Sequence, residues 1–217
     1  MKTILCILLS LSLLPSHSQP AQSRRQYYDS LMIENHRIQF SFLNLSGTDT
    51  VADIGTGAGY SLVPIASHFS GTRFVVEDID SNYTSIPLLL KTAKKTGYNI
   101  EPENFTVHIG SELSTTLPAG AFNKVLAFDV IHEMTYRNEM LQDIKRILAK
   151  NGRLFIGEIL VYKKRRKEKS CHYPFLKEDE LKELLAANGF TILREQVSFE
   201  HAVKHKYFKL FECRVNE

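Results

Sequence analysis

The chain has 217 residues, of which 43% are hydrophobic and 24% are charged, and its formal net charge is +3 at pH 7. This length and composition are typical of one well-filled soluble domain with room for a small appendage, and they exclude a low-complexity chain. The small positive excess argues neither for nor against nucleic acid, because nucleic-acid binding requires a clustered basic face.

The first 21 residues are predicted to lie outside the globular domain, which we assign to residues 22–217. Lys2 precedes an apolar run from Ile4 to Leu14, and small and polar residues follow that run. A basic start, a short apolar core and a small-residue cleavage pattern predict an export signal, which would place the domain in the periplasm or outside the cell. The run is shorter than the roughly 20 apolar residues that span a bilayer. An uncleaved membrane anchor with the domain facing the cytoplasm is the alternative, and a buried N-terminal helix is a third interpretation.

Three cysteines are present, Cys6, Cys171 and Cys213. Removal of a signal would leave Cys171 and Cys213, which could pair in an oxidising compartment, although two unpaired structural cysteines explain the pattern more simply. Their separation does not have metal-ligand spacing, so the sequence predicts no metal site.

Strand and helix patterns alternate along the domain. A leading helix is predicted from Gln26 to about Asn44. Strands are predicted over residues 50–54, 73–78, 105–109, 125–128 and 153–159, and helices over residues 61–69, 85–96 and 137–148. Asn151–Gly152 is predicted to end the helix over 137–148 and to start the strand that follows.

The last third of the domain ends in a helix and two strands. The helix is predicted to begin at Glu178, where acidic residues suit the positive end of the helix dipole, and to end at Asn188–Gly189. The strands, over residues 191–197 and 207–214, are predicted to form an antiparallel pair. The whole alternation predicts an α/β fold, doubly wound, with a mostly parallel sheet covered on both faces.

The stretch from Val51 to Tyr60, VADIGTGAGY, joins a predicted strand to a predicted helix through three glycines. A dinucleotide-binding loop has the pattern G-x-G-x-x-G, with an acidic residue about 20 residues further on. Here the third glycine, Gly59, comes one residue early, and no P-loop lysine follows. Asp53, at the end of the strand, would repel a pyrophosphate and favours a positively charged ligand.

Asp78 ends the next predicted strand, where a carboxylate can accept hydrogen bonds from both hydroxyls of a ribose. The carboxyl ends of parallel strands share one edge of a sheet, so Asp53, the glycine turn and Asp78 are expected at the same ligand-binding edge. S-adenosylmethionine has an ammonium group, a sulfonium and a ribose but no phosphate, and it fits this set. A scaffold corner with solvated acids is the alternative interpretation.

With these motifs in place, the chain from Thr50 to Glu217 resembles the class I S-adenosylmethionine-dependent methyltransferases, in their small-molecule branch. VADIGTGAGY is similar to the first motif of that family, VVEDIDSN to its second, and FNKVLAFDVIHEM to its fourth-strand motif. LQDIKRILAKNGRLFIGE is similar to its helix and fifth strand, and LKELLAANGFTILRE to its last helix and sixth strand. The resemblance implies a Rossmann-like sheet of seven strands with the last strand reversed.

The resemblance also implies which residues hold the cofactor. The methionine end would lie against Asp53, Gly55, Thr56, Gly57 and Gly59, and further contacts would come from Asp78 at the ribose, Ile79 at the adenine, Ser111 and Phe128. Ser111 stands where the family often has an aspartate that accepts from the adenine amino group. A hydroxyl accepts less strongly than a carboxylate, so this contact is expected to be weaker.

Methyl transfer from a sulfonium needs no metal and no covalent enzyme intermediate, so the protein mainly aligns the acceptor in a dry setting. A general base helps only where the acceptor loses a proton, as a phenol or an enol does. His132 and Glu133 follow the fourth strand and are the candidate catalytic residues, with Tyr136 and His172 as weaker candidates. A histidine that only hydrogen-bonds within the scaffold explains His132 equally well.

The acceptor is expected to be a small or lipid-like molecule. AFDVI carries no Asn/Asp-Pro-Pro-aromatic motif, so methylation of DNA adenine or of glutamine is not expected. One alternative is a module of the same fold that binds an adenosyl ligand without transfer, since an exported domain would lie away from a cofactor made inside the cell. The other is an RNA-modifying enzyme that uses the basic run Lys163–Lys169, although no aromatic residues interleave with that run and a solvated loop explains it better. Nothing in the sequence predicts the oligomeric state.

Overall fold

The computed structural model of the protein describes residues 24–162, 173–201 and 205–216. Its helices are α1 (Arg24–Leu43), α2 (Leu62–His68), α3 (Ile86–Thr96), α4 (Arg137–Ile147) and α5 (Glu178–Ala187), and a 3-10 turn, η1, spans Pro102–Asn104. Its strands are β1 (Thr50–Ile54), β2 (Arg73–Asp78), β3 (Phe105–Ile109), β4 (Phe122–Phe128), β5 (Leu148–Val161), β6 (Phe190–His201) and β7 (Lys206–Val215). No helix in these described ranges is both long enough and apolar enough to cross a membrane.

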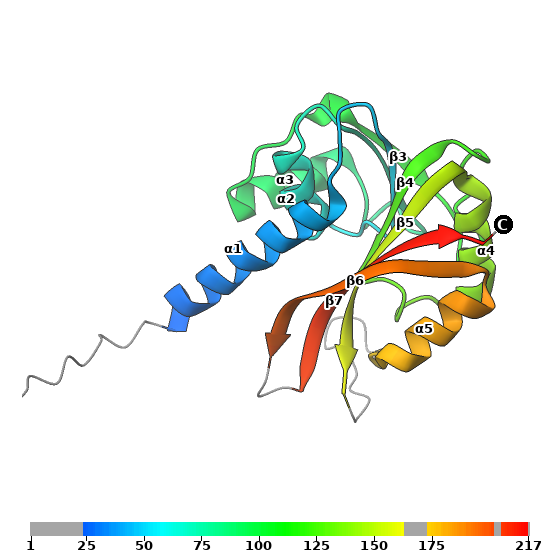
Figure 1. Cartoon of the computed structure of the whole chain (residues 1–217). Coiled ribbons are helices and arrows are strands. Elements are labelled where there is room, and N and C mark those ends of the chain that lie inside the picture. The colour runs from blue at the N-terminus through cyan, green and yellow to red at the C-terminus, as the bar shows by residue number, and fades with distance from the viewer. Residues whose placement is uncertain (1–23, 163–172, 202–204, 217) are drawn as a thin grey trace, which may run out of the picture.

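Within the described residues the strands form one seven-stranded sheet in the order β3-β2-β1-β4-β5-β7-β6 (Figure 1). The neighbours from β3 to β5 all pair in parallel. β7 is antiparallel to both β5 and β6. The prediction of a doubly wound, mostly parallel sheet with a reversed last strand is therefore confirmed. Because β1 to β5 run in the same direction, their carboxyl ends meet at one edge, which we call the carboxyl edge.

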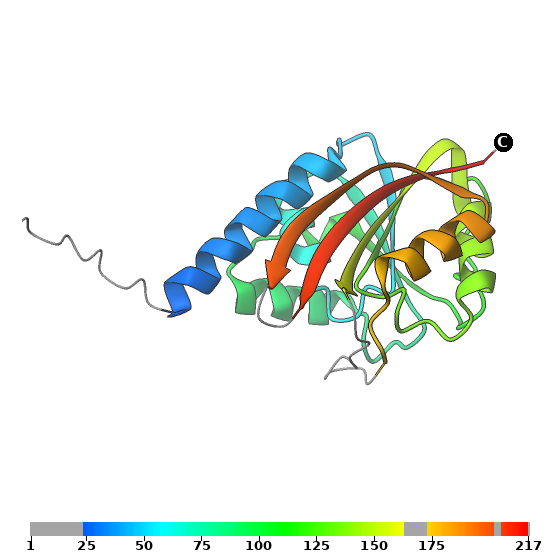
Figure 2. The same ribbon diagram turned by 60° about the horizontal axis from the view of Figure 1, so that its bottom comes forward.

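Helices cover both faces of the sheet and divide the core into two clusters. α4 and α5 bury residues such as Ile144 and Leu181 against one face. α1, α2 and α3 bury residues such as Leu43, Leu62 and Leu89 against the other face. In Figure 2, α1 and α5 lie on opposite sides of the ribbon that β6 and β7 form. Burial on both faces explains why the parallel strands are near-continuous apolar runs in the sequence.

Local signals set the ends of two helices. α3 has a proline in its first turn and stops at Gly97, whose φ of 79° is the left-handed conformation that favours glycine. In the first turn of α5 the Glu180 side chain accepts a hydrogen bond of 3.0 Å from the Lys177 backbone N–H. α5 then ends just before Asn188, as its sequence predicts.

The prediction that Asn151–Gly152 ends the helix before β5 is wrong. α4 ends at Ile147, and β5 begins at Leu148, which pairs with Phe122 of β4. Leu148 continues the apolar spacing of the helix but adopts extended dihedral angles, φ −63° and ψ 132°. Apolar spacing cannot separate a buried helical residue from the first buried residue of a strand, so the sequence pattern placed this boundary too late.

Several sequence predictions fall outside the described residues and stay predictions. They are the export signal or anchor over residues 1–21, the basic run Lys163–Lys169, and the residues Cys171 and His172. Cys213, the possible partner of Cys171, is a buried, unpaired cysteine of β7 in the part of the chain that the structure describes.

Candidate functional site

The loop after β1 is held by the last two residues of β2. The Thr56 N–H donates to the Glu77 carbonyl at 2.9 Å, and the Gly57 N–H donates to Asp78 Oδ2 at 2.8 Å. Two successive N–H groups of the loop therefore already have acceptors, and one of the acceptors is a carboxylate. A loop in this arrangement does not direct its N–H groups toward a phosphate.

The three glycines of this loop all have positive φ, with values of 68° at Gly55, 54° at Gly57 and 78° at Gly59. A Cβ atom on Gly55 would lie 2.2 Å from Val130 Cγ2, and one on Gly59 would lie 2.4 Å from Leu89 Cδ2. A Cβ atom on Gly57 would meet nothing within 4 Å. Gly55 and Gly59 therefore allow close packing of the loop against the protein, whereas Gly57 borders open space where a ligand can approach the backbone.

Two buried carboxyl groups lie at the carboxyl edge beside this loop. Asp53 is 5% exposed and Glu77 is 1% exposed. Burial, together with the negative charge of Asp78, raises the pKa of Asp53 from 3.8 to about 7 and the pKa of Glu77 from 4.5 to about 8. A cation brought to this edge would favour the ionised forms of these groups. The electrostatics of the loop therefore suit a positively charged ligand.

Large apolar side chains are exposed on the loops around the carboxyl edge. Tyr60 follows β1, Ile79 and Tyr83 follow β2, and Leu113 follows β3, and each of them is more than half exposed. Neighbouring exposed apolar side chains mark binding surfaces more often than scattered ones do. Ile79 therefore lies at the carboxyl edge, where the sequence predicts an adenine contact.

Three other residues predicted to contact a cofactor have partners within the protein. Thr56 Oγ1 donates to the Asp53 carbonyl at 3.0 Å. The Ser111 hydroxyl belongs to a turn after β3, where it donates to the Ser114 carbonyl at 3.1 Å and accepts from the Ser114 N–H at 3.2 Å. The Phe128 ring is buried, 6.2 Å from the ring of Phe208. The Phe128 side chain thus belongs to the core.

A second polar group lies where β4 and β5 meet the carboxyl edge. His132 Nδ1 lies 2.7 Å from Glu158 Oε1, and both side chains are fully buried. Burial lowers the pKa of His132, but the hydrogen bond and the charge of Glu158 outweigh burial and raise the pKa above its ordinary value. Glu158 Oε2 has no hydrogen-bond partner among the residues that the structure describes. The two side chains therefore form an oriented pair that can hold a proton.

The turn that carries His132 is fixed from α4 and borders Glu133. Arg137 donates to the carbonyls of Ile131 and His132, both at 2.8 Å. Glu133 Oε1 lies 3.8 Å from His132 Nε2, and the Glu133 side chain is 42% exposed. Of the two predicted catalytic residues, the structure therefore buries the histidine and leaves the glutamate at the surface beside it.

Asp129, His132 and Glu158 offer ligand atoms that all lie within 4.8 Å of one another. Residues of these types at such a spacing could hold a metal ion. The 2.7 Å contact between His132 and Glu158 has the length of a charge-assisted hydrogen bond, however. A metal ion at this place would have to replace the hydrogen bond between His132 Nδ1 and Glu158, because a histidine that binds a metal gives up the proton at that nitrogen.

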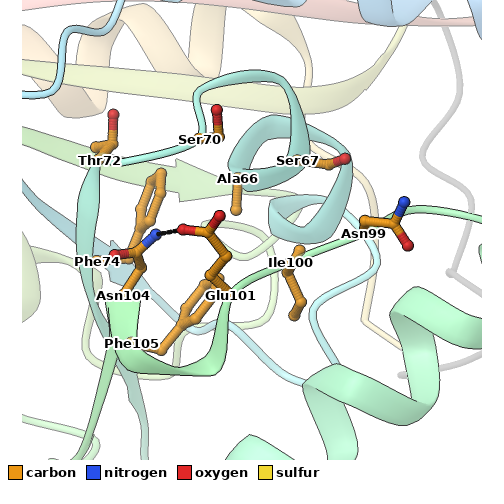
Figure 3. A pocket seen from close by; sticks show the side chains of 10 residues that line it. All are labelled: Ala66, Ser67, Ser70, Thr72, Phe74, Asn99, Ile100, Glu101, Asn104 and Phe105. Carbon is orange, nitrogen blue, oxygen red and sulfur yellow. Dashed lines mark hydrogen bonds between the residues drawn. The ribbon is translucent and has the colours of Figure 1, made fainter.

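A separate hollow of about 280 Å³ lies at the opposite edge of the sheet, beside the first residues of β2 and β3 (Figure 3). Phe74 and Phe105 line it with rings 5.7 Å apart, and Glu101 accepts a hydrogen bond of 3.0 Å from Asn104. None of the site residues predicted from the sequence lines this hollow. It is therefore distinct from the carboxyl edge, where open parallel sheets bind their ligands.

The comparison with known families agrees with the geometry of the carboxyl edge. A family model described as a methyltransferase domain matches residues 22–195, which is most of the chain. The chain belongs to the class I S-adenosylmethionine-dependent methyltransferases. The resemblance in the sequence is thereby confirmed. No curated protein matches the chain.

Solved structures with the same fold include both methyltransferases and an enzyme of another description. A SAM-dependent methyltransferase from Aquifex aeolicus is 20% identical, with a TM-score of 0.64 over 84% of this chain and 90% of that one. A Burkholderia thailandensis 1,6-didemethyltoxoflavin-N1-methyltransferase, solved with S-adenosylhomocysteine, is 20% identical, with a TM-score of 0.63 over 89% and 82%. The [4+2]-cyclase SpnF is 14% identical, with a TM-score of 0.65 over 83% and 80%. At these identities the likeness shows the fold.

The residues of this methyltransferase fit the family's cofactor, S-adenosylmethionine. Asp53 supplies a buried carboxyl group that a cation would ionise, Gly57 borders open space, and Asp78 and Ile79 follow in sequence at the neighbouring strand end. Sequence reasoning did not single out Glu77 or Glu158. The available signal was an acidic residue inside each of two otherwise apolar strands, in RFVVED and RLFIGEI.

Proposed function

We propose that this methyltransferase transfers the methyl group of S-adenosylmethionine to a hydroxyl group of a small-molecule or lipid-like acceptor. The single observation that carries the proposal is the buried hydrogen bond of 2.7 Å between His132 and Glu158 at the carboxyl edge. The cofactor supplies an electrophilic methyl group, and methylation of a hydroxyl releases a proton that the protein has to take up. A histidine is the side chain most often used for this task.

His132 is the proposed general base, and Glu158 is the residue that positions it. Because Nδ1 is held by Glu158, Nε2 is the nitrogen that would accept the acceptor proton. The negative charge of Glu158 stabilises the imidazolium that forms when the proton arrives. His132 has no exposed surface in this structure, so an acceptor reaches it only after a neighbouring side chain moves aside. Phe175, with its ring 5.6 Å from the His132 ring, and Glu133 are the neighbours in question.

A hollow of about 450 Å³ beside the carboxyl end of β5 is the proposed acceptor side of the site. Its lining includes Tyr162 and Tyr207, whose rings lie 4.6 Å apart. Lys206, the residue before Tyr207, places its Nζ 4.8 Å from the centre of the Phe175 ring, and the centre of the His132 ring lies 5.6 Å from the same ring. The volume lies within the range of small-molecule sites, and the lining combines the two tyrosine rings with the charged residues Lys177, Glu178, Asp179 and Lys182, which suits an acceptor with a flat ring and polar groups.

The test measures formation of S-adenosylhomocysteine by the full chain over a panel of phenols, enols and lipid-like alcohols. His132→Gln is expected to lower the rate of transfer about 10²- to 10⁴-fold while S-adenosylhomocysteine still binds. Glu158→Gln should also lower the rate. The matched control is His68→Gln, an exposed histidine on α2, which should transfer at the native rate. A His132→Gln variant that folds, binds and transfers normally would remove the base from the proposal.

A module that binds an adenosyl ligand without transfer is the second candidate. The [4+2]-cyclase SpnF supports this candidate, because it has the same fold and is named for a reaction other than methylation. Binding of S-adenosylmethionine with no product over the whole acceptor panel would favour this candidate.

An RNA-modifying activity would depend on Lys163–Lys169, which lie outside the described residues, and a steep salt dependence of RNA binding would be its signature.

A further inference from the structure

Two buried threonines tie the glycine loop after β1 to α3 and to the residues that lead into α3. Thr84 Oγ1 donates a hydrogen bond of 3.0 Å to the Gly57 carbonyl. Thr92 Oγ1, on α3, donates one of 2.7 Å to the Ala58 carbonyl. Thr84 is 1% exposed and Thr92 is 3% exposed. Two consecutive carbonyl groups of the loop are therefore held by hydroxyl groups that lie inside the protein.

One face of α3 contacts the second half of the loop. Leu89, Thr92 and Lys95 follow one another at intervals of three residues, a spacing that keeps side chains on the same side of a helix. Leu89 packs against Gly59, where a Cβ atom would lie 2.4 Å from Leu89 Cδ2. Lys95 Nζ donates to the Tyr60 hydroxyl at 2.8 Å. The hydrogen bond from Thr92 is thus one of several contacts that fix the loop against this helix.

Gly57 depends on such support because a glycine does not restrict its own backbone. Its φ of 54° is only one of the conformations open to glycine, and a Cβ atom there would meet nothing within 4 Å. Asp78 Oδ2 accepts the Gly57 N–H at 2.8 Å, and Thr84 donates to the Gly57 carbonyl. Both polar groups of the residue that borders open space are therefore tied to the protein. A loop ordered in this way before a ligand arrives pays less conformational entropy on binding.

We propose that Thr84 and Thr92 are positioning residues for the cofactor, and that their hydroxyl groups hold the glycine loop in the conformation that receives the methionine end of S-adenosylmethionine. They act through the carbonyls of Gly57 and Ala58, because both side chains are buried beneath these bonds. Without the hydroxyl group the carbonyl loses its donor, and ligand binding has to order the loop first. Both roles rest on the family's cofactor lying against Gly57, and neither needs a methyl acceptor.

The test is calorimetric titration of the full chain with S-adenosylhomocysteine, methionine and adenosine. Thr84→Val keeps the size of the side chain and removes the hydroxyl group. S-adenosylhomocysteine and methionine should bind this variant about three- to tenfold more weakly, whereas adenosine, which is expected at Asp78 and Ile79, should bind with the native affinity. Thr92→Val should give the same pattern. Thr84→Ser keeps the hydroxyl group and should restore the native affinity for all three ligands.

Thr72→Val is the matched control, because it removes the same kind of hydrogen bond at the opposite edge of the sheet. Thr72 directly precedes β2 and is 1% exposed, and its hydroxyl group donates to the Ser46 carbonyl at 3.2 Å. Thr72→Val should lower the free energy of unfolding, measured with urea, about as much as Thr84→Val does. All three ligands should nevertheless bind Thr72→Val with the native affinity. A merely structural role for Thr84 would make the two variants alike in binding as well as in stability.

Three results would overturn the proposal. One is a folded Thr84→Val or Thr92→Val variant that binds S-adenosylhomocysteine with the native affinity, and Thr92→Val keeps this comparison available if Thr84→Val fails to fold. Another is an equal loss of affinity for methionine and adenosine, which a general disturbance of the carboxyl edge would cause. The third is a Thr84→Ser variant that binds as weakly as Thr84→Val. None of these measurements uses a methyl acceptor, so failure of the proposed transfer reaction would leave the two roles standing.

Discussion

Thr56 and Gly57 present their backbone N–H groups to the last two residues of β2. In a phosphate-binding loop such groups point at the ligand. A phosphate placed here would instead meet the carboxylate of Asp78, and repulsion between like charges would oppose its binding. The acidic side chains, rather than the glycines, therefore decide which ligand this loop accepts.

Asp53→Ala is expected to abolish measurable binding of S-adenosylmethionine and to leave the fold intact. Asp53 is the buried carboxyl group near the end of β1 that ionises beside a cation, and its burial costs free energy that alanine does not cost. Calorimetry measures the binding, and a circular-dichroism melt measures the fold. Glu103→Gln, which changes an exposed carboxylate on η1, is the control and should bind S-adenosylmethionine with the native affinity. Native affinity in Asp53→Ala would show that the loop does not hold the cofactor.

Asp78→Ala is expected to weaken every ligand that contains adenosine and to change the affinity for free methionine very little. Loss of a charged hydrogen-bond acceptor should cost about 1.5–3 kcal/mol of binding free energy, or about ten- to a hundredfold in affinity. S-adenosylhomocysteine, adenosine and methionine are titrated in parallel. Asp80→Ala is the control. Asp80 lies two residues after Asp78, and its side chain accepts a hydrogen bond from the Asn82 N–H. An equal loss for methionine would contradict the ribose role.

At the scale of elements, the loop after β1 packs against the turn after β4 without room for a methyl group. Gly55→Ala would bring Cβ to 2.2 Å from Val130 Cγ2 and would keep an unfavourable φ of 68°. We expect a loss of about 2–4 kcal/mol in the free energy of unfolding, measured with urea. Adding Val130→Ala should recover the part due to the clash.

Gly57→Ala is the matched control for Gly55→Ala. Its φ is 54°, but its Cβ would meet nothing within 4 Å, so it reports the backbone strain alone, about 1–2 kcal/mol. If Gly55→Ala and Gly57→Ala lose the same stability, or if Val130→Ala rescues neither, close packing between the two loops is not what requires Gly55.

The first three strands could be predicted from their short apolar runs, although β3 lies at an edge of the sheet and is buried only at Phe105. The predicted ranges 50–54, 73–78 and 105–109 coincide with β1, β2 and β3. A continuous apolar run between turn residues has few other interpretations in an alternating α/β chain. β5 was harder, because its first residue, Leu148, continues the apolar spacing of α4.

The site could be predicted where its residues follow one another in the sequence, and not where they meet across the sheet. Asp53, the glycines and Asp78 belong to short motifs at strand ends. The pair of His132 and Glu158 depends on the parallel pairing of β4 with β5, which brings together residues 26 positions apart. An acidic residue inside an apolar strand signals that some partner exists, but only the topology says which one.

For the whole molecule, groups with a raised pKa and groups with a lowered pKa make the free energy of unfolding depend on pH in opposite directions. The raised pKa of Glu77 means that the folded state holds its proton up to about pH 8 while the unfolded state loses it near 4.5. This contribution to stability is therefore lost as pH rises between these values. The pKa of His132 is raised by Glu158, so its contribution to the free energy of unfolding is also lost as the pH rises above 6.5.

Glu178 changes the free energy of unfolding in the opposite direction. Although burial raises its pKa, hydrogen bonds from Lys182, Lys209 and Tyr207 outweigh burial and lower the pKa to about 2.

The free energy of unfolding should therefore be greatest near pH 5 and should fall toward both pH 2 and pH 9. Glu77→Gln should flatten the alkaline side, by at most about 5 kcal/mol, because glutamine has no proton to lose. Glu178→Gln should flatten the acid side by about 1–3 kcal/mol, because its stabilisation is present above pH 4.5 and is lost as pH falls toward 2. Urea denaturation of the native chain and both variants at intervals of one pH unit measures this. A native curve that keeps rising from pH 5 to pH 9, or a Glu77→Gln curve parallel to it, would contradict the assignment of a neutral buried carboxyl group beneath the loop.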